Sequence, residues 1–175
     1  MPNTSGHAYG LTIFCPIKER TPEGQCAIFY TRDILQNLSS DQDEDFKASP
    51  LAAVPNTYMA RFLILDEALF QGYPYHEDQL QSSYLVFTAN FHGALDSYLQ
   101  GMYHSMKEQI FAIWKYCYGF ENVQQSEASG AGEAAFVRFI KKCQVKTTFF
   151  FNGSTDDSLE DRTGYGRSSY PVVSS

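Results

Sequence analysis

The sequence has no run of about 18 or more apolar residues, so it predicts no membrane-spanning segment and no membrane partner. It is poor in positive charge, because 13 Lys and Arg stand against 20 Asp and Glu, a formal net charge of -7. Nucleic-acid-binding domains usually carry a basic surplus, so this balance argues against a nucleic-acid partner. The first residues lack the basic and apolar regions of a secretory signal, and we therefore expect a cytoplasmic protein.

The familiar catalytic and metal-binding motifs are also missing. The chain contains no G-x-G-x-x-G, Walker, H-E-x-x-H or G-x-S-x-G pattern. Its four cysteines, Cys15, Cys26, Cys117 and Cys143, include no C-x-x-C pair. A redox pair or metal site is one interpretation, and small buried hydrophobic side chains in a cytosolic protein are the other. We adopt the second and predict no metal site.

Aromatic residues, by contrast, are abundant. The chain has 14 Phe, 12 Tyr and 1 Trp, together 15% of its residues. Disordered chains are poor in aromatics, so most of this chain should fold. The length suits one domain, which we place at residues 9–153, followed by a polar C-terminal tail at residues 154–175. An acidic stretch at residues 39–49 is predicted to be a solvated loop, since it lacks the EF-hand pattern of a divalent-cation loop.

Alternation and helical spacing predict the order β-α-β-β-α-(α)-β. The strands are expected at residues 10–17, 58–66, 82–91 and 147–151, and the helices at residues 22–38, 93–118 and 133–143. This order predicts an α+β protein with the ferredoxin-like split βαβ arrangement. Such a fold has a four-stranded antiparallel sheet with its helices on one face.

The strands at 58–66 and 82–91 are apolar on both sides. A single layer of helices covers one sheet face, so a partner, a loop or a ligand must cover the other. For residues 58–66 this pattern indicates either a central strand or a face that meets a second subunit. We therefore expect a homodimer that pairs through the open sheet face, with the long loop at 67–81 as the rival cover.

Arg61 is the first candidate ligand-binding residue, because it is a charge among apolar neighbours in a predicted strand. Burying a charge is costly unless it is paired. One interpretation makes Arg61 an anchor for an anion on the open sheet face, which Thr88 and Asn90 would also line. The other makes it part of a structural ion pair with Asp66, Asp96 or a residue across the dimer.

Asn90 and His92 precede the helix predicted at 93–118, and either cap this helix or form a ligand site at its N-terminus, with His92 as acid–base group or ligand. Tyr58 and Tyr84 complete the candidate ligand-binding set. Tyr84 belongs to a tyrosine-rich group for which we consider three roles: a gate over a pocket, a source of phenolic protons, or packing of a loop. No catalytic residue is assigned.

His104 is predicted about 180° from the apolar stripe of its helix, whereas a buried haem ligand would have to lie on that stripe. No cofactor is therefore predicted, and haem is a minor alternative.

Four segments resemble bacterial ferredoxin-like proteins of no established function: residues 11–18, 57–66, 85–93 and 149–153. That group often carries the unit twice in a chain, whereas it occurs once here, so the resemblance implies a homodimer that supplies the second half. More distantly, the pattern is similar to dimeric α+β barrel proteins, which include small monooxygenases, stress-responsive barrels and haem-binding chlorite-dismutase and dye-peroxidase relatives.

Three functions follow as expectations. The first is a non-catalytic or accessory protein that binds a small molecule in a pocket on the open sheet face. The second is a dimeric-barrel enzyme, either cofactor-free and monooxygenase-like or haem-dependent and peroxidase-like. The third is a structural subunit of a larger assembly.

Overall fold

The structure is a computed structural model that describes residues 3–38, 49–67, 72–73 and 80–153. Most of the predicted acidic loop at 39–49, most of the loop at 67–81 and the whole predicted tail at 154–175 lie outside the described residues.

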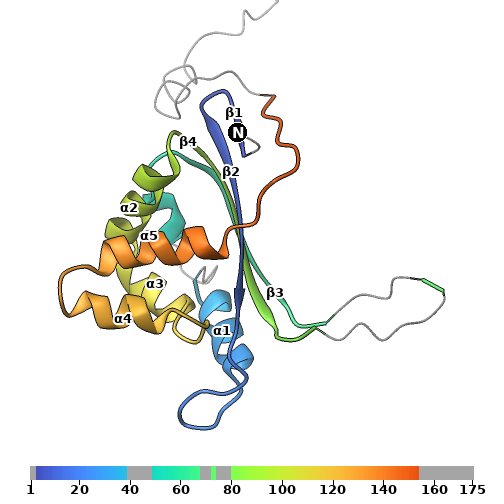
Figure 1. The fold of residues 1–175 in the computed structure, drawn as a ribbon, viewed down its shortest axis with the longest axis vertical. Helices are drawn as coiled ribbons and strands as arrows, with labels where there is room; N and C mark the ends of the chain where they lie inside the picture. Colours follow the sequence, from blue (N-terminus) through green and yellow to red (C-terminus); the bar gives the residue numbers. More distant parts are fainter. Residues whose placement is uncertain (1–2, 39–48, 68–71, 74–79, 154–175) are drawn as a thin grey trace, which may run out of the picture.

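Four antiparallel strands form one open sheet in the order β1-β2-β4-β3 (Figure 1). They are β1 (Thr4–Ser5), β2 (Ala8–Pro16), β3 (Thr57–Leu65) and β4 (Tyr84–His92). The α+β class and the four-stranded antiparallel sheet are thus confirmed. Because β3 lies at an edge of the sheet, the alternative that this segment is a central strand is wrong.

The helices gather on one side of the sheet (Figure 1). They are α1 (Ala27–Gln36), the short 3-10 helix η1 (Pro50–Ala53), α2 (Leu95–Ser105), α3 (Lys107–Ile113), α4 (Glu121–Glu127) and α5 (Gly132–Cys143). The side chains of β2 and β4 that face this layer are buried, among them Leu11, Ile13, Leu85 and Phe87. Trp114 lies fully buried at the centre of the core, with its ring against Phe62, Phe87 and Phe136.

The helix predicted at 93–118 is divided into α2 and α3 at Met106, whose φ of -139° and ψ of 40° are not helical. The predicted apolar stripe is nevertheless buried from Leu99 to Cys117. α2 contacts α5, while α3 contacts α1.

The helix predicted from residue 22 begins only at Ala27, because Thr21 closes a turn instead of capping a helix. The Thr21 hydroxyl accepts a hydrogen bond from the Gln25 N–H at 3.2 Å, and Gly24 adopts a left-handed φ of 83°. The segment between the helices predicted at 93–118 and 133–143, for which no element was predicted, contains α4.

The strand predicted at 147–151 does not form. The reason is that β1 pairs with β2 through Thr4 and Tyr9 and occupies this part of the sheet edge. After α5, the chain touches the edge only briefly, where the Val145 N–H donates to the carbonyl of Thr12 at 2.9 Å. It then runs past β1 and places the ring of Phe150 against Gly10.

Candidate functional site

The open face of the sheet carries a cavity of about 270 Å³, which we call the open-face cavity. Its floor is formed by residues of β2, β3 and β4, and one wall comes from the irregular segment that follows α5. The lining residues are Gly10, Leu11, Thr12, Met59, Arg61, Thr88, Ala89, Asn90, Thr147 and Phe150.

Arg61 is exposed on this face, where strand pairing places it opposite Thr88. Both acidic partners considered from the sequence are paired with other cations. Asp66 accepts from Arg32 at 2.8 Å, and Asp96 lies 2.5 Å from Lys141. The predicted ion pair of Arg61 with Asp66 or Asp96 is therefore wrong, and no other described carboxylate pairs with its guanidinium.

Asn90 shares the open-face cavity with Arg61, as the strand alternation predicts. It lies opposite Gly10 on β2 and Met59 on β3. Its half-buried side chain makes no hydrogen bond to another described residue. The cavity therefore has an amide as well as a guanidinium available to a ligand.

Tyr58 and His92 form a separate pair at one end of the sheet. The Tyr58 hydroxyl lies 3.1 Å from His92 Nδ1, and the His92 ring stacks on His7 with 5.4 Å between ring centroids. The register of β3 against β4 shifts between Thr57 and Met59, which leaves Tyr58 as the extra residue of a bulge. His92 lines a different cavity of about 270 Å³, between the turn at Pro55 and Asn56 and the first turns of α2.

Neither Asn90 nor His92 caps α2, so the predicted capping by these residues is wrong. The residue at the cap is Ala94, which makes no side-chain hydrogen bond to the helix. Asp96 does lie in the first turn, where its charge suits the helix dipole.

Tyr84 lies at the opposite end of β4 from His92. It pairs with Pro16 and Leu65, and its ring lies 6.2 Å from that of Phe14. Eight residue steps along an antiparallel strand span about 27 Å. The candidate set thus falls in three places, and only Arg61 and Asn90 share a cavity.

The wall residues Phe150 and Thr147 were missed, because their segment was predicted to extend the sheet. The sequence held one signal for them. A glycine within a strand often marks a close approach of another part of the chain, and Gly10 is such a residue. A Cβ at Gly10 would lie 2.9 Å from Phe150 Cδ2.

All four cysteines are free thiols. Cys15 is buried, and a hydrogen bond with Cys117, together with burial, raises its pKa well above the ordinary value. Its hydrogen bond with Cys143, together with burial, likewise raises the pKa of Cys143. Cys15 and Cys143 are therefore protonated thiols, and Cys15 and Cys117 are buried in the core. The described residues contain no cluster of side chains suited to a metal ion.

His104 lies on the exposed side of α2, as the helical wheel predicts, and its Nε2 lies 2.9 Å from a Glu133 carboxylate oxygen. Within the described part of the chain, no helix is long and apolar enough to cross a membrane. Comparison of the chain with protein-family models, curated proteins and solved structures gives no match.

Proposed function

We propose that this protein binds a small organic anion in the open-face cavity and acts by binding rather than by catalysis. The observation that carries the proposal is Arg61, a guanidinium at a cavity with no carboxylate partner among the described residues. Its neighbours Thr88 and Asn90 supply a hydroxyl and an amide. We also propose that the fold is ferredoxin-like, as the order of elements predicted from the sequence suggests.

The chemistry of these groups favours a carboxylate. The fork of guanidinium N–H donors matches the two oxygens of a carboxylate, and charge-assisted hydrogen bonds of this kind are among the strongest in proteins. Amide and hydroxyl donors add directional contacts. Pockets for drug-sized ligands begin at about 300 Å³, so a cavity of about 270 Å³ suits a molecule the size of benzoate.

The lining argues for binding over catalysis. Acid–base catalysis needs a titratable group within hydrogen-bond reach of the substrate. The described residues of the open-face cavity include no imidazole, carboxylate or thiol. His92 and Tyr58, which could exchange protons, belong to the other end of the sheet.

A second copy of the chain is proposed as the cover of the open face, as in a dimeric α+β barrel. Met59 and Leu63, which share the face with Arg61, are 65% and 37% exposed. An isologous contact would bury both and close the cavity. Four free cysteines suit a reducing compartment, so the cytoplasm is the proposed location.

Calorimetric titration of the full chain with benzoate, and with benzamide as its uncharged counterpart, tests the ligand. We expect benzoate to bind and benzamide to bind at least tenfold more weakly. Arg61→Gln should abolish benzoate binding, while Lys146→Gln, a change to an exposed cation outside the cavity, should leave it intact. Equal binding of benzoate by both variants contradicts the proposal.

Light scattering tests the dimer. We expect a mass of twice 19.8 kDa for the wild type and a monomer for Leu63→Glu. Phe29→Glu is the control, because Phe29 is 68% exposed on α1, on the helical side of the molecule. A wild type that remains monomeric at micromolar concentration contradicts the dimer and leaves the ligand proposal to be judged by calorimetry.

A further inference from the structure

A larger cavity of about 600 Å³, which we call the edge cavity, opens beside the end of β2. It lies between this strand and the pair of helices α4 and α5. Its apolar lining includes Phe14, Val123 and Phe139, and its polar lining includes Ser126, Arg138 and Lys142.

β4 pairs with one edge of β2 along its whole length, but among the described residues no strand pairs with the other edge of β2 beyond Tyr9, and the edge cavity lies beside the second half of that edge. The chain after α5 bridges β2 at Ile13 and Thr12 and then leaves the sheet edge. At the end of β2, the segment that precedes α4 contacts the same edge, where the Tyr118 N–H donates to the carbonyl of Pro16 at 2.9 Å.

Two cations on α5 face this space. Arg138 and Lys142 are four residues apart, so they lie on the same side of the helix, and both are exposed. Neither forms an ion pair with another described residue, whereas their neighbour Lys141 pairs with Asp96. Like charges at this spacing repel each other, and an anion between them would relieve the repulsion.

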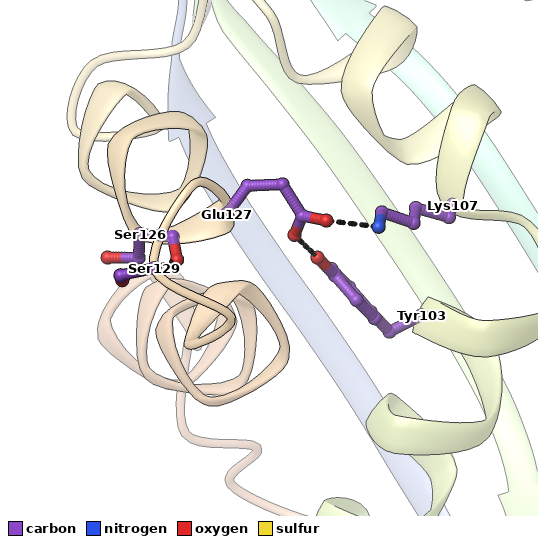
Figure 2. A network of polar contacts seen from close by, with 5 residues as sticks. All are labelled: Tyr103, Lys107, Ser126, Glu127 and Ser129. Carbon is purple, nitrogen blue, oxygen red and sulfur yellow. Dashed lines mark hydrogen bonds and ion pairs between the residues drawn. The ribbon is translucent and has the colours of Figure 1, made fainter.

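Both acidic side chains of α4 that are adjacent in sequence to a lining residue are paired with lysines, Glu121 with Lys18 and Glu127 with Lys107. The carboxylate of Glu127 accepts hydrogen bonds from Tyr103 and Lys107, away from Ser126 (Figure 2). The bond from Lys107, together with that from Tyr103, lowers the pKa of Glu127. Its charge is therefore neutralised by Lys107, and the cavity keeps the positive character of Arg138 and Lys142.

From this juxtaposition we infer that the edge cavity is a second binding site, for a carboxylate with an extended apolar body such as a medium-chain fatty acid. The apolar lining would receive the hydrocarbon chain, and Arg138 and Lys142 would bind the carboxylate. A volume of about 600 Å³ lies within the range of ligand pockets. This site is independent of Arg61 and of the proposed dimer.

Calorimetric titration with octanoate, and with octanol as its uncharged counterpart, tests the inference. We expect octanoate to bind the wild type, and the double variant Arg138→Gln, Lys142→Gln to bind it at least tenfold more weakly. Lys146→Gln is the matched control and should bind like the wild type. Ser126→Phe, which fills the cavity from α4, should abolish binding of both octanoate and octanol.

The two proposed sites are distinguished by exchanging the variants. Arg61→Gln should lose benzoate and keep octanoate, and the double variant on α5 should do the opposite. Because Arg138 and Lys142 are exposed, the double variant should fold, which its thermal unfolding curve checks. Octanoate binding that is absent in the wild type, or unchanged in the double variant, overturns the inference.

Discussion

The ring of Phe150 packs against Gly10 so closely that a β-carbon on Gly10 would lie 2.9 Å from Phe150 Cδ2. The contact joins a residue of β2 to a segment that has no regular secondary structure. It builds one wall of the open-face cavity, because both residues line it.

Gly10→Ala should destabilise the protein by about 1–3 kcal/mol, because the added methyl group forces the Phe150 ring to move. Chemical denaturation measures the change. In a Phe150→Ala background the sign should reverse, with Gly10→Ala stabilising by about 0.5 kcal/mol, since alanine loses less entropy than glycine in a strand. The same destabilisation in both backgrounds would show that the ring does not rest on Gly10.

Arg61→Ala should change the free energy of unfolding by less than about 0.5 kcal/mol, because Arg61 is exposed and forms no ion pair with a described residue. Had Arg61 been part of a buried pair, its removal would cost about 3–5 kcal/mol. Urea denaturation at neutral pH separates the two cases. Arg32→Ala, which breaks the pair with Asp66, provides an exposed ion pair for comparison.

Glu127→Gln should lower stability at pH 7 by about 1 kcal/mol, because a charged acceptor for Tyr103 and Lys107 is lost. The folded-state pKa of Glu127 lies below its ordinary value of 4.5. Its contribution to stability is therefore complete above pH 4.5 and is lost as the pH falls through the folded-state value.

Melting temperatures of the wild type and Glu127→Gln, measured between about pH 7 and 3, should thus converge at the acid end. The control is Glu108→Gln, a change to an exposed carboxylate outside this network. A gap between wild type and Glu127→Gln that stays constant with pH would show that the ionised carboxylate contributes nothing.

The Tyr58 hydroxyl should fix the tautomer of neutral His92. We expect the hydroxyl to donate to Nδ1, which lies 3.1 Å away, and this direction requires the ring proton to be on Nε2. Long-range proton–nitrogen correlation spectra should show this tautomer in the wild type and a mixture in Tyr58→Phe. His104, on the exposed side of α2, is the internal reference and should not change. An unaltered His92 signal in Tyr58→Phe argues against the hydrogen bond.

Much of the fold follows from local patterns in the sequence. Alternation along 10–17 and 82–91 predicted two strands, and β2 and β4 form there with alternate side chains such as Ile13 and Phe87 buried. Apolar residues recur every two positions in a strand and about every 3.6 positions in a helix. Such a pattern indicates which side of the element is buried, and it can be read from residues close together in the sequence. The stripe from Leu99 to Cys117 was predicted for the same reason, although its helix is broken at Met106.

The sequence by itself also placed Arg61 and Asn90 on one sheet face, because residues of matching parity on paired strands share a side. Only the tertiary structure decided what surrounds them. Whether Arg61 is paired depends on Asp66 and Asp96, and these carboxylates are taken by cations far away in the chain. Ion pairs between distant segments leave no local pattern.

Tertiary structure also decided that residues 147–151 do not form a strand. Their apolar character suits a strand, but a strand needs a free edge. The two-residue strand β1 pairs with the edge of β2 beside Tyr9, so this edge is not free. Competition for backbone hydrogen bonds at that edge therefore turned a predicted strand into one wall of the open-face cavity.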